Sequence, residues 1–192
     1  MTSIVEHPQA VHIFDDFLLP PFEGNELKRI ASLRTKKDVN RYFWHDLKTA
    51  APISLEISRL YQRVLKAVTI TEEAKLVGFE YWANELGPRD SLAIHSDVDE
   101  YLYVKHRQLR CAQIGVIYFG ACTDLRGGEL VFEDGIIVSP RSNRCVVFFG
   151  ATRHGVERIS NGSRSTVVMS IWDHATQAAE EGITLEDAGC AS

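Results

Sequence analysis

The feature that most constrains the fold of this chain is a series of short β-type segments in its second half. From Gly78 onward, about eight apolar runs rich in β-branched and aromatic residues follow one another, separated by turn sequences such as Asp134-Gly135 and Asn161-Gly162. Runs of this kind at regular spacing are typical of all-β sandwiches and barrels. The expected strands are residues 79–86, 92–95, 112–119, 130–133, 136–138, 145–149, 155–159 and 165–172.

The first 77 residues carry helical rather than β-type patterns. After a short strand or extended segment at residues 11–19, the stretches Glu23 to Leu33 and Ile53 to Val68 place apolar residues at helical spacing. The aromatic cluster within residues 38–49 is expected to be a loop held to the body by its rings, and a wall of a substrate pocket is the less favoured alternative. No helical pattern interrupts the strands, which argues against a parallel βαβ sheet. We therefore expect a mainly β fold with supporting N-terminal helices (α+β).

The length of 192 residues favours one domain with a substantial core. We divide it into helical and extended support in residues 1–77, a β core in residues 78–174 and an acidic tail in residues 175–192. The tail is expected to be a short helix followed by a mobile end.

Composition and charge exclude several classes of function. A net charge of −5 with scattered Lys and Arg gives no electrostatic basis for binding nucleic acid. No apolar run is long enough to span a bilayer, and the stretch Met1 to His12 lacks the basic start and apolar run of a secretory signal. The four cysteines form no Cys-x-x-Cys pair and fit reduced, structural thiols. We expect a cytoplasmic protein with neither a nucleic acid nor a membrane as its partner.

Three side chains form a candidate metal site. His95 and Asp97 lie two positions apart, so on an extended backbone both leave from the same face. A second imidazole, His154, follows a long β-type stretch. Two histidines and one carboxylate bind one face of a metal and leave the opposite face open, which is the ligand set of non-haem Fe(II) oxygenases.

The last β-type run begins with an arginine. We expect this run to pair antiparallel with the strand that His154 introduces. If its even-numbered face points inward, Arg164 is a buried cation that needs an anion, and a guanidinium pairs well with the carboxylate of an α-keto acid. The side chains expected on that face are those of Arg164, Thr166, Val168, Ser170 and Trp172.

Together these features resemble the iron- and 2-oxoglutarate-dependent dioxygenases, specifically their prolyl-4-hydroxylase-like branch. The marks of the resemblance run in family order over roughly residues 78–172. They are His95-Ser96-Asp97, Gly127-Gly128-Glu129-Leu130-Val131-Phe132, His154-Gly155-Val156, and Arg164 ten positions beyond His154. The chain departs from the family at Glu85-Leu86-Gly87, where a Tyr-x-x-Gly or Tyr-Pro-Gly sequence is common.

The resemblance implies a double-stranded β-helix core, also called a jelly roll and shared with cupins. In that core His95, Asp97 and His154 would bind Fe(II), and Arg164 would bind the C5 carboxylate of 2-oxoglutarate. Tyr118 matches the family tyrosine that assists this arginine, and Thr166 stands where related enzymes have the serine of an Arg-x-Ser pair.

The function that the resemblance implies is hydroxylation of an unactivated C–H bond in an amino acid, a short peptide or a small metabolite. The reaction would consume 2-oxoglutarate and O2, release succinate and CO2, and use ascorbate as a supporting reductant. Candidate residues at the mouth of the site are Trp82, Asn84, Arg126 and Trp172. Two other classes stay open: a cupin-like metalloenzyme with the same three ligands that does not use 2-oxoglutarate, and a non-catalytic jelly-roll binding module.

Overall fold

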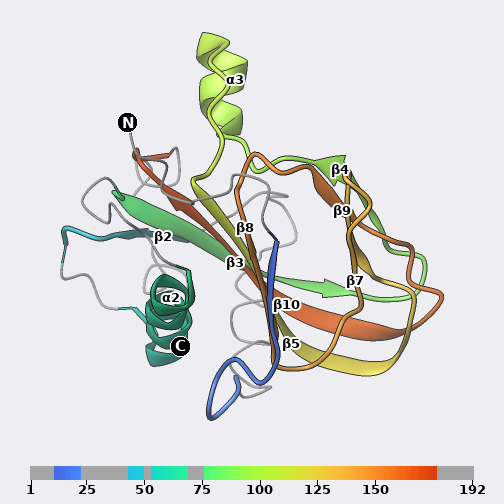
Figure 1. Cartoon of the computed structure of the whole chain (residues 1–192). Coiled ribbons are helices and arrows are strands. Elements are labelled where there is room, and N and C mark those ends of the chain that lie inside the picture. Colours follow the sequence, from blue (N-terminus) through green and yellow to red (C-terminus); the bar gives the residue numbers. More distant parts are fainter. Residues whose placement is uncertain (1–10, 23–42, 50–52, 69–75, 177–192) are drawn as a thin grey trace, which may run out of the picture.

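The computed structural model describes residues 11–22, 43–49, 53–68 and 76–176. Two antiparallel sheets and two helices make up this part of the chain (Figure 1). The elements are β1 (His12–Phe14), β2 (Phe43–Asp46), α2 (Leu55–Ala67), β3 (Gly78–Leu86), β4 (Leu92–His95), α3 (Glu100–His106), β5 (Ile114–Arg126), β6 (Leu130–Phe132), β7 (Ile137–Val138), β8 (Arg144–Phe148), β9 (His154–Val156) and β10 (Asn161–Trp172).

The larger sheet has the strand order β1-β8-β5-β10-β3-β2, and the smaller sheet has the order β4-β9-β6-β7. In Figure 1 the smaller sheet lies on one side of the larger one, and α2 lies on the other side. Non-consecutive strands are neighbours in both sheets, as in a jelly roll. The expected mainly β fold with a jelly-roll core is confirmed.

Successive side chains of β10 point to opposite faces of the larger sheet, so this sheet contributes to two hydrophobic cores. Val167 and Met169 belong to the core that the sheet forms with α2, whereas Val168 belongs to a second core between the two sheets. Helix α2 begins at Ser54, whose hydroxyl accepts a hydrogen bond from the Ile57 N–H (3.3 Å). It then buries Ile57, Leu60, Tyr61 and Val64 against the sheet.

Three expectations about the elements need correction. The strand of His154 does not pair with that of Arg164, because β9 lies between β4 and β6 while β10 lies between β5 and β3. The connection after the metal motif contains helix α3, so a helix does interrupt the strands. The described part of the aromatic cluster forms β2 at an edge of the larger sheet, where Phe43 and Trp44 are buried.

Two expected segments, the helix at residues 23–33 and the tail from residue 177, lie outside the described residues. Among the described helices, neither has the length and apolar character needed to cross a membrane. Cys111, Cys122 and Cys145 are free thiols, as expected.

Candidate metal centre

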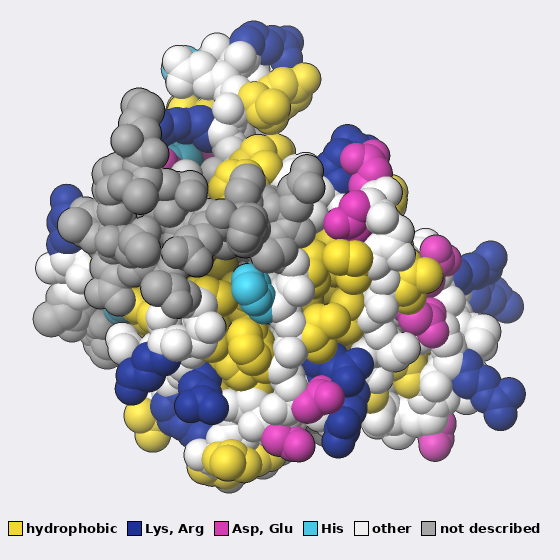
Figure 2. Space-filling model, in the orientation of Figure 1, with side chains coloured by type: hydrophobic (Ala, Val, Ile, Leu, Met, Phe, Trp, Pro, Cys, Tyr) yellow, Lys and Arg dark blue, Asp and Glu magenta, His cyan; other side chains and the backbone are white. Residues whose placement is uncertain are grey.

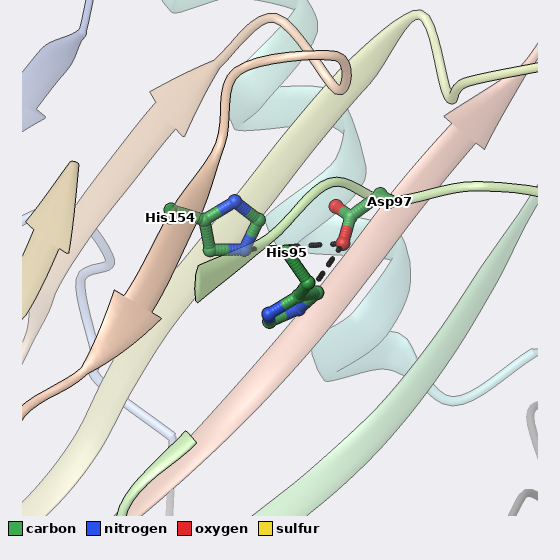
Figure 3. Close-up of side chains that lie close together, drawn as sticks. All are labelled: His95, Asp97 and His154. Atoms are coloured by element: carbon green, nitrogen blue, oxygen red, sulfur yellow. Dashed lines mark ion pairs between the residues drawn. The ribbon is translucent and has the colours of Figure 1, made fainter. Parts of the chain in front are cut away.

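Sheet register brings the two histidines together. His95 ends β4 and His154 begins β9, and the two residues are directly paired across the smaller sheet. Their ring centroids lie 4.6 Å apart, and each Nε2 lies 3.9 Å from Asp97 Oδ1 (Figure 3). One ligand atom from each of the three residues lies within 4.8 Å of the other two. The three side chains therefore converge on a single point, which a divalent metal could occupy.

Main-chain contacts select the ring nitrogen that faces this point. His95 Nδ1 lies 2.8 Å from the Ala93 carbonyl oxygen, and His154 Nδ1 lies 2.9 Å from the Thr152 carbonyl oxygen. A carbonyl oxygen only accepts hydrogen bonds, so each Nδ1 carries the proton and each Nε2 keeps its lone pair. Both imidazoles are thus held in the tautomer that binds a metal through Nε2.

A hydrogen bond to the oxygen that faces away from the histidines orients the Asp97 carboxylate. Its Oδ1 faces both histidines, while its Oδ2 accepts a hydrogen bond from Ser170 Oγ on β10 (3.3 Å). Gly115 on β5 leaves the space for this arrangement, since a Cβ there would lie 3.1 Å from Asp97 Oδ2 and 2.5 Å from the Phe148 ring. The two carboxylate oxygens therefore have different surroundings, and one of them is directed at the metal position.

The electrostatics of the three residues suit a cation. Burial lowers the pKa of His154, although the Asp97 carboxylate acts in the opposite direction. A neutral imidazole is the form that binds a metal. The two histidines also differ in exposure, because 47% of the His95 side chain is accessible but only 5% of the His154 side chain. The donor set fits Fe(II), and the metal position would be reached from the His95 side.

A buried arginine lies in the same cavity. Arg164 is 3% exposed, and its Nη1 donates a hydrogen bond to the Gly128 carbonyl oxygen (2.7 Å). Its guanidinium lies over the Phe119 ring, and burial lowers the pKa of Arg164 to about 10. Its Nε and the Thr166 hydroxyl are buried and have no hydrogen-bond partner among the described residues. These unsatisfied donors fit the distal carboxylate of a keto acid such as 2-oxoglutarate.

The predicted site residues divide into those that line the cavity and those that do not. The cavity lies between the two sheets and is lined by Trp82, Asn84, Leu92, His95, Asp97, Ile117, His154, Val156, Arg164, Thr166 and Val168. Trp172 shares the face of Arg164 but is buried further along β10, against Trp44 and Ala112. Arg126 is exposed at the end of β5. Neither of these two residues is among those that line the cavity.

Tyr118 is a further correction. It pairs in register with Val167, so its side chain lies on the α2 side of the larger sheet, opposite the cavity. Its hydroxyl donates to Asn143 Oδ1 (3.0 Å) and accepts from the Phe22 N–H (3.3 Å). Its neighbours on β5 face the site instead, since Ile117 lines the cavity and Phe119 lies against the Arg164 guanidinium, and alternation along β5 is the signal that could have identified them.

A second polar cluster lies beside the metal position. The Thr176 hydroxyl donates to Glu80 Oε1, and burial raises the pKa of Glu80 to about 7. His174 lies between two carboxylates, with Nε2 3.1 Å from Asp99 Oδ2 and Nδ1 2.8 Å from Asp173 Oδ1. The segment that follows β10 is therefore attached both to β3 and to the residue that begins α3.

Comparison with known proteins supports the fold. No protein-family model matches the sequence, and no curated protein sequence matches it. Among solved structures, a 2OG-Fe(II) oxygenase-family oxidoreductase from Burkholderia pseudomallei is similar with a TM-score of 0.55 and 14% identity, over 86% of each chain. A prolyl-4-hydroxylase from Pseudomonas putida gives a TM-score of 0.51 and 15% identity, over 87% of this chain and 89% of that one.

A third similar structure is a 2OG complex of the viral collagen prolyl hydroxylase from Paramecium Bursaria Chlorella virus-1. It has a TM-score of 0.53 and 12% identity, over 84% of this chain and 94% of that one. At these identities the likeness concerns the fold, and it spans most of each chain. The chain therefore has the fold of the 2-oxoglutarate- and Fe(II)-dependent oxygenases, as the sequence motifs predict.

Proposed function

We propose that this protein is an Fe(II)- and 2-oxoglutarate-dependent dioxygenase that hydroxylates an unactivated C–H bond of an amino acid, a short peptide or a small metabolite. The observation that carries the proposal is that two features open onto one cavity. One is the convergent set of His95, Asp97 and His154, and the other is the buried, incompletely satisfied Arg164. A divalent metal and a dicarboxylic keto acid would satisfy both at once.

Each residue has a distinct task in this proposal. His95 and His154 supply Nε2 and Asp97 supplies Oδ1 to the metal, leaving its opposite side open. Arg164 and Thr166 hold the distal carboxylate of 2-oxoglutarate, while Ile117, Val156 and Val168 keep water out of the cavity. Bound iron and 2-oxoglutarate supply the oxidation of a C–H bond by O2, with succinate and CO2 as the other products and ascorbate as a supporting reductant.

Arg164 distinguishes this proposal from the two alternatives. A cupin-like metalloenzyme that does not use a keto acid would not need a buried guanidinium beside the metal position. A non-catalytic binding module would need neither the guanidinium nor the two histidines held in the metal-binding tautomer. Burying Arg164 and His154 costs free energy, and the proposed function accounts for that cost.

The proposal is tested by binding and turnover. Anaerobic calorimetry should show one Fe(II) bound per chain, and 2-oxoglutarate should then bind with an affinity that falls about a hundredfold in Arg164→Met. Arg126→Met is the matched control, since Arg126 lies outside the cavity. Succinate release against a panel of amino acids, peptides and metabolites then identifies the substrate. Iron binding without 2-oxoglutarate binding would favour the cupin-like alternative, and absence of iron binding would favour the binding module.

A further inference from the structure

Helix α3 and the turn after it project from the body of the molecule. In Figure 1 the helix stands clear of both sheets, and it contains no buried residue. Every residue from Tyr103 to Arg110 is exposed. Figure 2 shows hydrophobic and basic side chains on this projection, at the top of the view. We call residues 99–110 the α3 arm, because they form a unit that contributes nothing to the hydrophobic core.

Local contacts nevertheless hold the α3 arm in one shape. The Asp99 carboxylate caps the helix by accepting from the Leu102 N–H (2.9 Å), and Arg107 ends it in the left-handed conformation. The base is closed where the Asp99 N–H donates to the Arg110 carbonyl oxygen (2.8 Å) and where Val98 pairs with Cys111. A seven-residue helix has little stability of its own, so these contacts maintain a helix that tertiary packing does not.

The side chains displayed on the α3 arm are those found at protein interfaces. Tyr103 is 49% exposed, Val104 62% and Leu109 68%. Lys105, Arg107 and Arg110 lie among them and are exposed too. Tyr and Arg are enriched where proteins bind one another, and large apolar side chains displayed together mark such surfaces. The acidic residues of the arm, Asp99 and Glu100, lie at its base, and the exposed run 103–110 carries three basic residues and no acidic one, whereas the whole chain has a net charge of −5.

We propose that the α3 arm is a docking site for an acidic polypeptide segment that also carries apolar side chains. Acidic residues would meet Lys105, Arg107 and Arg110, and apolar residues would cover Val104 and Leu109. The proposal concerns binding alone and does not rest on the proposed enzymatic activity.

Charge and size favour a polypeptide over the other candidate partners. Nucleic acid needs a wide basic footprint, and the apolar side chains of the arm would face its phosphates unfavourably. A helix that lies in a membrane surface needs one broad apolar face, whereas the exposed large apolar side chains of α3 are only those of Tyr103 and Val104.

The test uses a fluorescein-labelled synthetic peptide of repeated Glu-Glu-Leu-Tyr units, with binding followed by fluorescence anisotropy. A surface of this size predicts a dissociation constant in the micromolar range that rises with salt. The double variant Arg107→Glu/Arg110→Glu should weaken binding at least about tenfold, and Val104→Ser/Leu109→Ser should weaken it severalfold. The matched control, Lys48→Glu/Arg158→Glu, changes the net charge equally at exposed positions outside the arm and should bind as the unmodified protein does.

Far-UV circular dichroism and urea unfolding of each variant are measured in parallel, and unchanged values show that the fold is intact. The proposal is overturned if the unmodified protein does not bind the acidic peptide, or binds an equivalent Lys-Lys-Leu-Tyr peptide as well. Equal loss in the control variant would also overturn it. So would arm-dependent binding to phosphatidylserine vesicles instead of the peptide, or a dimer in sedimentation velocity that Val104→Ser/Leu109→Ser dissociates, because each assigns the arm a different partner.

Discussion

The hydrogen bond between Ser170 and Asp97 gives a prediction with a definite magnitude. Ser170 lies on β10, is almost fully buried, and donates its hydroxyl to Asp97 Oδ2 over 3.3 Å. Replacing Ser170 by Ala removes this donor and leaves the carboxylate free to rotate away from the two histidines. A hydrogen bond to a charged acceptor contributes about 1.5 to 3 kcal/mol, and the long distance places this one at the lower end.

About 1.4 kcal/mol corresponds to a tenfold change in an equilibrium constant, so Ser170→Ala should bind a divalent metal about tenfold more weakly. The assay is an anaerobic titration with Fe(II), repeated with Co(II), whose visible spectrum reports the coordination geometry. Ser170→Thr retains a hydroxyl at the same position and should restore most of the affinity. Circular dichroism of the metal-free variants separates a change in binding from a change in folding.

One result would refute this reasoning. If Ser170→Ala binds both metals within about twofold of the unmodified protein and gives the same Co(II) spectrum, Ser170 does not orient Asp97. The need for glycine at position 115 would then come from the close Phe148 ring alone and not from the Asp97 carboxylate.

Three further predictions follow from the site and its surroundings. His95→Ala and Asp97→Ala should each abolish stoichiometric iron binding and 2-oxoglutarate turnover in calorimetry and succinate assays, and full activity in either variant would refute the assigned ligand set. Because burial raises the pKa of Glu80 from 4.5 to about 7, its neutral form stabilises the fold fully below pH 4.5, and this contribution is lost as the pH rises to 7. The free energy of unfolding of the metal-free protein, measured in urea and compared with that of Glu80→Gln, should therefore fall by on the order of 3 kcal/mol across that range. If the free energies of unfolding of the two proteins change with pH in the same way, this prediction is wrong. Tyr118→Phe should lower the free energy of unfolding by about 1 kcal/mol, through loss of the bond to Asn143, and leave 2-oxoglutarate affinity unchanged; a large loss of affinity would place Tyr118 in the site after all.

Alternation along a single strand proved a reliable guide to the site. The even-numbered residues of β10 were expected to share a face, and Arg164, Thr166 and Val168 do line the same cavity. The expectation needed only the period of an extended strand, which does not depend on the partner strand. The pair His95 and Asp97 was recognisable from its spacing alone, although β4 ends at His95 and Asp97 follows it.

Relations between strands were harder to predict. Tyr118 was assigned to the cavity by its place in a motif, but the register of β5 with β10 turns it to the opposite face. That pairing contains irregularities on either side of Arg164, and one residue of slip reverses every side chain. The partner of β9 was also missed, because a jelly roll pairs strands that are distant in the sequence.

Helix α3 was missed for a different reason. Residues 99–110 have no amphipathic period, since the helix buries none of its side chains and faces solvent all round. The sequence signal that could have identified it is local, with Asp99 as a capping residue and Glu100 in the first turn.

The attachment of the chain beyond β10 has a consequence for how far the protein can be shortened. Thr176 satisfies the buried Glu80, and His174 lies against Asp99, the residue that starts α3. A chain cut after Trp172 would keep the described strands and the three metal ligands, yet it would remove Thr176 from the buried Glu80 and His174 from the buried Asp99. The shortest chain that retains a stable iron-binding core should therefore extend through Thr176.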